Sequence, residues 1–332
     1  MRLPHSIFES RFFVFDFVDE LLSALDGAID AGEISAIRNL TDKGLVPVSS
    51  PVVLAAILGV NEGIIWSFLN STAHHYRSFQ IHKGRKTRTI LAPRVALKVV
   101  QRWLAYHLSR AYQAPRHVYG FVPDRSHVGA ASCHLRASWV NSFDIRNFFP
   151  STPEGLVCVA LGEEGYCEKS AGLIAKLSCI NGFLVQGSPL SPVLSNLALS
   201  KLDDDLCKIA LSFDVRLTRY ADDITFSGTS GYPDGLREAV EDAFSQSPWD
   251  LATDKTSYSK LPERLSVHGL LVHGETLRLT KRKRNRVRAL EHLRSQERIR
   301  DNEARSVNSF IGYHEYVEGN RGNRGQSEVF TK

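Results

Sequence analysis

The sequence lacks the features of membrane and secreted proteins. In its 332 residues no apolar run approaches the roughly 20 residues that span a bilayer. The first residues do not read as a signal peptide, because Glu9, Arg11 and Asp16 interrupt the apolar stretch. The five cysteines contain no C-x-x-C pair, so neither a disulfide framework nor a cysteine-rich zinc site is expected. These absences predict a cytoplasmic protein with reduced thiols and no membrane partner.

What is present is an ordinary globular composition with unevenly placed positive charge. Hydrophobic residues make up 43% and charged residues 23%, and the formal net charge is +5. Basic residues crowd positions 281–300, where only Glu291 and Glu297 oppose them, and a second basic stretch covers 82–88. A solvated surface is the ordinary explanation of one such cluster, but two clusters in one chain favour a polyanionic partner.

The hydrophobic pattern predicts an α+β chain without internal repeats. Helical spacing covers much of the first 72 residues and returns after position 95, at 155–179, as one long helix at 191–212, and at 281–317. Alternating segments predict a hairpin over 74–93 with its turn at 83–85, and strands at 139–145, 256–261 and 266–277. A few antiparallel strands flanked by helices form an α+β domain.

The most informative segment is Tyr220-Ala221-Asp222-Asp223, which lies between two alternating apolar stretches. The pattern predicts a β-hairpin with both aspartates at its turn. Adjacent carboxylates repel each other and raise each other's pKa unless a cation lies between them. Taken alone, the pair is best explained as a solvated turn, so its meaning depends on the rest of the chain.

A third acid, Asp144, ends the apolar strand predicted at 139–145. If the two strands are neighbours, three carboxylates converge at one end of a sheet. Oxygen donors without a His or Cys cluster point to a hard cation, above all Mg²⁺. Two such ions roughly 4 Å apart stabilise the attacking and leaving oxygens of an in-line phosphoryl displacement. The predicted chemistry is nucleotidyl transfer.

With these residues in place, the chain resembles reverse transcriptases over about residues 75–275. Tyr220-Ala221-Asp222-Asp223 resembles the third palm motif of that family. The other similar segments occur in the family's order: a fingers motif at 83–93, the first palm motif at 142–150 (SFDIRNFFP), the second at 186–196 (QGSPLSPVLSN), the fourth at 253–256 (TDKT) and the primer grip at 268–270 (HGL).

The resemblance implies a right-hand polymerase fold and assigns roles to residues. It implies an N-terminal helical extension over 1–72, fingers and palm over 73–275, and a basic helical thumb with a tail over 276–332. Asp144, Asp222 and Asp223 are expected to hold two Mg²⁺ ions, with a backbone carbonyl from Ile145 or Phe143 as a further ligand. The residues expected to contact the incoming dNTP are Lys83, Arg88, Phe149, Gln186, Gly187 and Lys255.

Three of these assignments have plain alternatives. Phe149 is expected to close off the sugar 2′-OH and so select deoxynucleotides, but it could instead be a core phenylalanine. Lys83 could touch only solvent or template phosphate. Lys255, expected near the leaving pyrophosphate, could be a surface lysine.

The retron type of reverse transcriptase is favoured by the loop at 120–126 and by the absence of an RNase H, maturase or endonuclease segment after the expected thumb. Retrons carry Asn-Ala-x-x-His where this chain has Ala130 to His134, and Val-Thr-Gly where it has His268. The resemblance implies a structured noncoding RNA as template and primer, an RNA–DNA hybrid product, RNA-linked DNA and an antiphage role with a separate effector protein. Arg284, Arg286 and Arg288 are the expected RNA contacts.

Three other functions have to be weighed from the sequence. A group II intron-like or other defence polymerase would share the three acids and differ in priming. An inactive RNA-binding scaffold is disfavoured because the three acids, the Gln-Gly turn and the basic fingers are all retained. An RNA-directed RNA polymerase is disfavoured by Phe149 and by the wording of the motifs.

Overall fold

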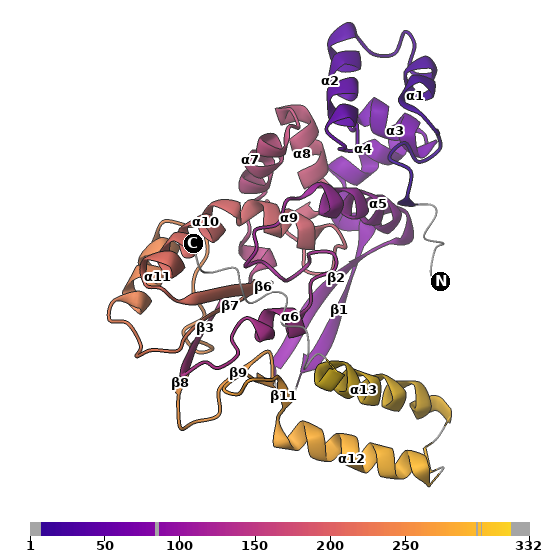
Figure 1. The fold of residues 1–332 in the computed structure, drawn as a ribbon. Helices are drawn as coiled ribbons and strands as arrows, with labels where there is room; N and C mark the ends of the chain where they lie inside the picture. Colours follow the sequence, from indigo (N-terminus) through magenta and orange to yellow (C-terminus); the bar gives the residue numbers. More distant parts are fainter. Residues whose placement is uncertain (1–7, 84–85, 297, 300, 320–332) are drawn as a thin grey trace.

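The N-terminal part of the chain is helical, as predicted. The computed structural model describes residues 8–83, 86–296, 298–299 and 301–319. Side chains of Asp30, Ser50 and Asn61 accept hydrogen bonds from the first turns of three helices, which explains where those helices begin. These helices lie at the top of Figure 1 and are α1 (Val18–Ala24), α2 (Ala31–Asp42), α3 (Pro51–Leu58) and α4 (Glu62–Asn70).

The predicted hairpin over 74–93 forms between β1 (Tyr76–Lys83) and β2 (Lys86–Pro93), with Lys83 paired to Lys86. Helix α5 (Val95–Ala111) follows and buries the predicted face, which carries Leu97, Val100, Trp103, Leu104, His107 and Leu108. The hairpin projects as a long two-stranded ribbon alongside the central sheet (Figure 1).

A four-stranded antiparallel sheet, called here the palm sheet, forms the centre of the molecule. Its strand order is β6 (Arg216–Tyr220), β7 (Asp223–Gly228), β3 (Trp139–Asp144) and β8 (Ser257–Lys260). Alternate residues such as Phe143 and Phe226 enter the main core. Since side chains alternate along a strand, Asp144 and Asp223 belong to the opposite face.

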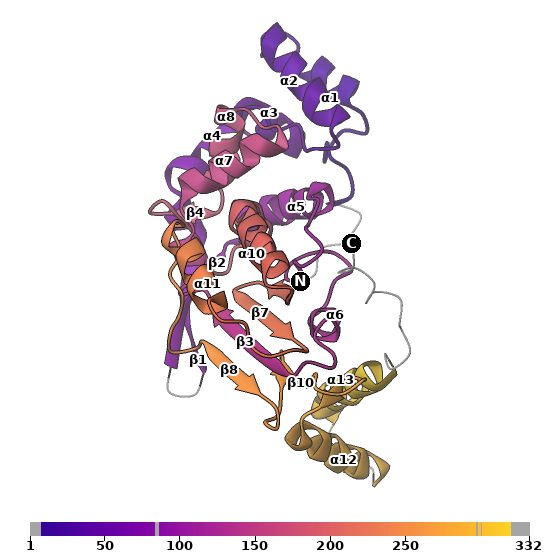
Figure 2. The ribbon, with the colours of Figure 1, turned by 60° about the vertical axis from the view of Figure 1, so that its left-hand side comes forward.

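Helices cover the apolar face of the palm sheet, and Figure 2 shows α10 and α11 above it. The single helix predicted over 191–212 is wrong, because the chain forms two helices that meet at Leu199. The Ser195 hydroxyl donates back to the Pro192 carbonyl, a contact that bends helices. The helices are α7 (Glu154–Glu164), α8 (Glu168–Lys176), α9 (Ser191–Ala198), α10 (Ser200–Ser212) and α11 (Leu236–Ser245).

The strand predicted over 266–277 is also wrong, since this segment forms two short strands that join a third, just after it, in a small sheet. His268 and Gly269 both have positive φ, which turns the chain back on itself. The strands are β9 (Ser266–Val267), β10 (Leu270–Leu271) and β11 (Arg278–Leu279), and the basic tail forms α12 (Lys281–Ser295) and α13 (Asp301–Gly319).

The remaining elements are short. They are η2 (Thr72–His75), α6 (His127–Ser132), η3 (Phe149–Ser151), β4 (Cys179–Ile180) and β5 (Phe183–Leu184).

Helix α6 joins the small sheet of β9, β10 and β11 and the C-terminal helices in a second hydrophobic core that includes Val128, Val267, Val287 and Val317. None of the helices in the described residues is long and apolar enough to cross a membrane. The fold is therefore α+β, as the sequence predicted.

A buried histidine ties the segment after α6 to the palm sheet. The ring nitrogens of His134 lie 2.6 Å from the Ser227 hydroxyl and 2.7 Å from the Thr218 hydroxyl, on neighbouring strands. Burial, with the positive charge of Arg216 adding to it, lowers the pKa of His134 from 6.5 to about 3. The ring is therefore held neutral between β6 and β7.

This histidine should make the stability of the fold depend on pH. Below pH 6.5 the unfolded chain binds a proton at His134 that the folded chain refuses until about pH 3, so stability falls as the pH falls through that window. Replacing His134 with Gln should lower stability near neutral pH. It should also reduce the slope of unfolding free energy against pH by up to about 1.4 kcal/mol per pH unit. Urea unfolding of both proteins at several pH values measures this, and equal slopes would contradict it.

Candidate active site

The three predicted acids converge at one end of the palm sheet. Asp144 and Asp223 are direct cross-strand partners, the last residue of β3 opposite the first of β7. Asp222 precedes Asp223 in a two-residue turn closed by the pair Tyr220–Asp223, and its carbonyl accepts a 2.9 Å hydrogen bond from the Ile145 amide. The hairpin with both aspartates at its turn is thus present as the sequence predicted.

A lysine and a histidine from later in the chain lie against these acids. Lys255 forms an ion pair with Asp144, and His268 Nδ1 lies 3.3 Å from Asp223 Oδ2. Burial and the nearby Asp144 carboxylate raise the pKa of Asp222. The arrangement concentrates negative charge at one locus and brings a lysine to its edge.

The donor set suits a hard divalent cation, although the protein alone builds no closed cage. In the part of the chain that the structure describes, no group of three His, Cys, Asp or Glu side chains is arranged to hold a metal ion by itself. Mg²⁺ sites are usually of this open kind, with one or two carboxylates, several waters and substrate phosphates. The oxygen donors of the acids therefore fit Mg²⁺ bound together with a phosphate-bearing substrate.

A fully buried arginine holds the turn from behind. Arg219, just before the turn on β6, makes a bidentate pair with Asp203 of α10 at 2.6 Å for both bonds. Its remaining amino group donates to the carbonyl of Ala221 and to Asn196, both at 3.1 Å. Burial alone would raise the pKa of Asp203, but the guanidinium overcomes that effect and the pKa is lowered.

The turn is strained and closely packed. Ala221 has φ +59°, a left-handed conformation that is uncommon outside glycine. Gly120 lies so close to it that an added Cβ would come within 2.1 Å of the Ala221 amide nitrogen. The Gly120 carbonyl accepts from Asn196 at 3.0 Å, so the loop, α9 and the turn are linked by hydrogen bonds.

The Gln186-Gly187 turn lies against the hairpin strand β2. The Leu91 amide donates to the Gln186 carbonyl at 3.1 Å. Gly187 has φ +124°, and an added Cβ would lie 2.5 Å from the Leu91 carbonyl oxygen. Glycine is therefore required here by the approach of β2. The helix that follows begins at Ser191, with Pro192 in its first turn.

Phe149 is half-buried at the start of η3, beside the buried ring of Phe148 at 5.2 Å between centroids. Its other neighbour is Phe121, with centroids 6.0 Å apart. One flank of Phe149 thus packs on the core while the ring stays partly exposed, so the gate and core interpretations are not exclusive.

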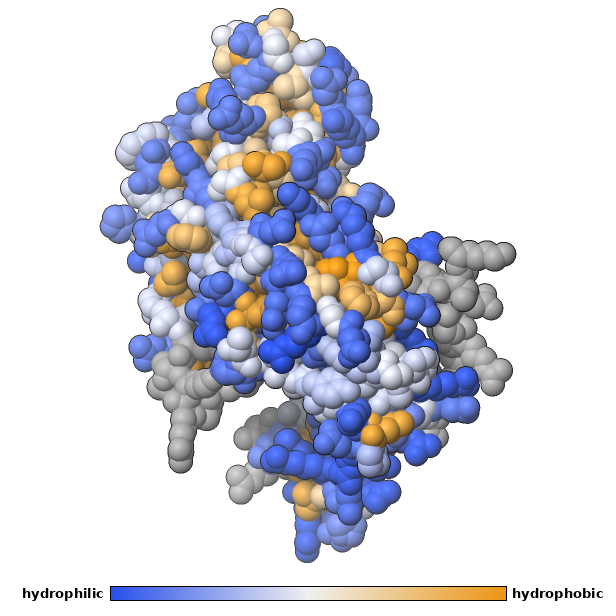
Figure 3. Space-filling view, turned by 90° about the vertical axis from the view of Figure 1, so that its left-hand side faces the viewer, coloured by the Kyte–Doolittle hydropathy of each residue, from blue (hydrophilic) through white to orange (hydrophobic). Residues whose placement is uncertain are grey.

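The predicted basic contacts occupy two other places. Lys83 and Arg88 lie on β1 and β2, but their side chains fall outside the described residues. On α12, Arg288 is exposed, Arg286 lies over the Phe310 ring at 5.1 Å, and Arg284 is half-buried. The three arginines do not share one face of the helix. The lower end of the molecule, where Figure 1 shows α12, is mostly hydrophilic in Figure 3.

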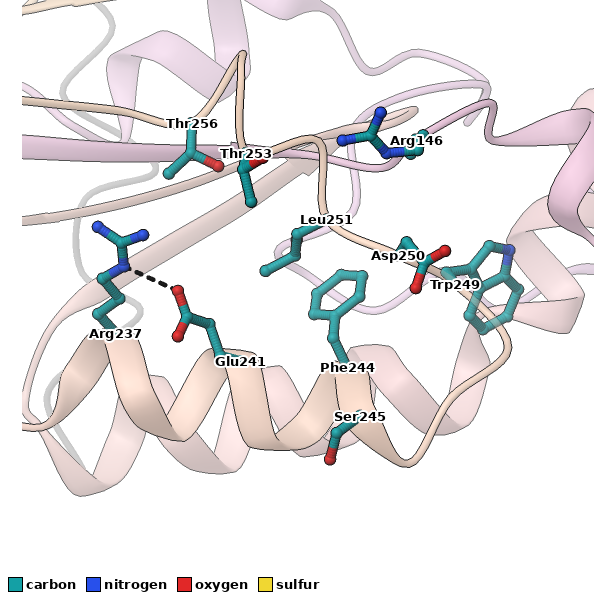
Figure 4. A pocket seen from close by; sticks show the side chains of 10 residues that line it. All are labelled: Arg146, Arg237, Glu241, Phe244, Ser245, Trp249, Asp250, Leu251, Thr253 and Thr256. Atoms are coloured by element: carbon teal, nitrogen blue, oxygen red, sulfur yellow. Dashed lines mark hydrogen bonds and ion pairs between the residues drawn. The ribbon is translucent and has the colours of Figure 1, made fainter.

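A cavity of about 410 Å³ lies beside α11. Figure 4 shows it between α11, which contributes Phe244 and the ion pair Arg237–Glu241, and the segment from Trp249 to Thr256. None of the three acids lines it. The predicted metal ligands therefore do not belong to this cavity.

The sequence interpretation missed Asp203 and Arg219, and it named Gly120 and His268 without foreseeing their contacts with the catalytic turn. Arg219 offered a signal, since a charged residue follows Leu217 and Thr218 inside a strand that is buried on both faces. Asp203 lies beside Leu202 and one turn from Leu206, on the buried side of α10. A buried acid and a buried base in one chain favour a pair, but their spacing along the chain does not reveal it.

Comparisons with known proteins agree with this geometry. The profile of the reverse transcriptase (RNA-dependent DNA polymerase) family matches residues 81–270. The chain is 30% identical over 223 residues to the Retron Ec86 reverse transcriptase of Escherichia coli, covering 65% of this chain and 69% of that protein. It is 31% identical over 264 residues to the Retron Mx65 reverse transcriptase of Myxococcus xanthus, covering 72% and 61%.

A further retron relative and a solved structure complete the comparison. The Retron Mx162 reverse transcriptase of Myxococcus xanthus is 30% identical over 265 residues, covering 69% of this chain and 54% of that protein. Telomerase from Candida albicans has a TM-score of 0.44 at 12% identity, covering 63% of this chain and 49% of that one, a likeness too distant to bear on function. With its ordered motifs, converging acids and profile match, the chain belongs to the reverse transcriptase family and is of the bacterial retron type.

Proposed function

We propose that this chain is a retron RNA-directed DNA polymerase that copies a structured noncoding RNA into RNA-linked single-stranded DNA (msDNA). The observation that carries the proposal is the convergence of Asp144, Asp222 and Asp223 at the end of β3 and β7. Relatives named as retron reverse transcriptases support the choice of substrate. The RNA would serve as template and primer, in the cytoplasm, and the system would act in antiphage defence with a separate effector protein.

Two Mg²⁺ ions would be held by the three aspartates and a backbone carbonyl of Ile145. When bound, such ions neutralise the phosphates and lower the barrier to displacement of pyrophosphate. The positions of the three aspartates would be set by contacts within the protein, such as the hydrogen bond from Arg219 to the Ala221 carbonyl. Lys255, at the edge of the acidic locus, would face the leaving pyrophosphate once its pairing with Asp144 opens.

The incoming dNTP would bind between the palm sheet and the β1–β2 hairpin. Gln186 and Gly187 would border this space from the hairpin side, because the Gln186 carbonyl accepts a hydrogen bond from the Leu91 amide of β2. Lys83 and Arg88 on the hairpin would neutralise the triphosphate, for which a guanidinium is suited by its paired donors.

The C-terminal helices would contact the RNA and the RNA–DNA hybrid product. Arg288 and Arg286 are exposed on α12 and could meet phosphates, while Arg284 is half-buried and would reach them less easily. A double-stranded RNA stem offers phosphates and 2′-OH groups rather than readable base edges. We also propose that the lobes divide as the sequence predicted, at 72/73 and at 275/276.

The acids are tested most directly by replacing Asp222 with Asn. DNA synthesis on a primed RNA template should fall below detection, because a carboxylate ligand is lost. The folded protein should be as stable or more stable, since burial and Asp144 disfavour the ionised carboxylate of Asp222. Primer extension and thermal unfolding measure the two effects. The exposed Asp214, just before β6, provides the control as Asp214→Asn. Retained DNA synthesis in Asp222→Asn would contradict the assignment of Asp222 as a catalytic metal ligand.

Replacing Gly120 with Ala should impair synthesis without contact to substrate. The new Cβ would press on the Ala221 backbone and displace the turn that carries the aspartates. A displacement of an ångström can cost up to about a hundredfold in rate. Gly172, which has nothing within 4 Å of its added Cβ, supplies the control as Gly172→Ala. Normal primer extension by Gly120→Ala would show that the turn tolerates the shift.

Replacing Phe149 with Ala should raise ribonucleotide incorporation if its exposed side faces the sugar. Incorporation of matched dNTP and rNTP on one template gives the selectivity ratio. Phe121→Ala is the matched control, since it removes the neighbouring ring and leaves Phe149 in place. An unchanged selectivity ratio in Phe149→Ala would show that Phe149 does not select the sugar and serves only in core packing.

A further inference from the structure

His268 occupies a backbone position that suits other residues better. It lies with Gly269 in the two-residue turn between Val267 of β9 and Leu270 of β10. The φ angles are +50° at His268 and +76° at Gly269, and two positive values are what a type I′ turn requires. Asn-Gly is the usual sequence for that turn, so histidine gains nothing locally. An outlier of this kind next to a site suggests a functional constraint.

The His268 side chain touches both residues that close the catalytic turn. Its Nδ1 lies 3.3 Å from Asp223 Oδ2, and its ring centroid lies 5.1 Å from that of Tyr220. Tyr220 and Asp223 are cross-strand partners. The side chain is only 9% exposed, so the imidazole is packed against the base of the hairpin.

The other ring nitrogen has no comparable contact. His268 Nε2 is buried without a hydrogen-bond partner among the residues described by the structure. Leaving a buried polar atom unpaired costs about 1–3 kcal/mol. The Asp223 contact and the Tyr220 packing are the interactions of this ring that can offset that cost.

The backbone of the His268 turn is anchored independently of its side chain. Val267 and Leu270 are buried in the second core, together with Val287 of α12. Lys283 Nζ donates to the Gly269 carbonyl at 3.4 Å. The turn is therefore a fixed platform from which the imidazole reaches the catalytic hairpin.

We propose that His268 is a positioning residue that orients the carboxylate of Asp223 for polymerisation. The proposal rests on the proposed function and names a device of this chain, since retrons carry threonine at this position. A threonine hydroxyl is borne on Cβ and reaches less far than an imidazole nitrogen. By holding Oδ2 on one side, His268 limits rotation of the Asp223 carboxylate beside Asp222 and Asp144.

Two substitutions separate this role from a merely structural one. Both new residues suit a type I′ turn, so neither should disturb the backbone. His268→Gly removes the ring, whereas His268→Asn keeps an amide nitrogen near the place of Nδ1. The exposed His273, in the loop after β10, supplies the control as His273→Asn. Without metal, the unfolding temperature of each variant should lie within a few degrees of the wild-type value or above it.

The first readout is binding of metal alone. The rise in unfolding temperature on adding MgCl₂ without nucleic acid should be reduced in His268→Gly and largely restored in His268→Asn.

The second readout is primer extension, in which His268→Gly should need about tenfold more Mg²⁺ for half-maximal rate and show a lower kcat. Its KM for dNTP should stay near the wild-type value.

Glycine and asparagine variants that behave alike, or a glycine variant that matches the wild type, would overturn the positioning role. A wild-type protein that fails to extend a primer would overturn the proposed function instead. In that case the MgCl₂ unfolding shifts still decide the role of His268, because they require no polymerase activity.

Discussion

The buried pair between Arg219 and Asp203 is the interaction on which the candidate active site depends. Both side chains are fully buried, and removing one partner of such a pair costs about 3–5 kcal/mol. What it provides is placement, because the same guanidinium also donates to the Ala221 carbonyl inside the catalytic turn. Helix α10, which covers the apolar face of the palm sheet, thereby fixes the conformation of the turn between β6 and β7.

The acidic end of the sheet shows why such a clamp is needed. Three carboxylates at one locus repel each other, and burial further disfavours the charge on Asp222. Lys255 offsets part of this repulsion through its ion pair with Asp144, while the Arg219 contact to Ala221 holds the backbone of the turn. An open set of oxygen donors held in this way can accept a cation and a phosphate together, which a closed protein cage could not.

Local pattern predicted much of the fold. The β1–β2 hairpin, the face of α5 and the β6–β7 turn follow from periodicity and are present as predicted. The single helix over 191–212 and the single strand over 266–277 were wrong for a shared reason. Each is interrupted inside an apolar pattern: α9 and α10 meet at Leu199, which no residue type announces, and the chain turns at His268-Gly269, where only Gly269 gave a signal.

By itself, the sequence determined that three acids, a Gln-Gly turn and two basic stretches occur in the order of a reverse transcriptase. It determined which strand ends carry the acids, because apolar alternation sets where a strand faces the core. Only the tertiary structure decided that Asp203 meets Arg219, that Gly120 touches Ala221 and that His268 reaches Asp223. These contacts join residues distant in the chain, and their energies depend on burial and distance, which no local pattern encodes.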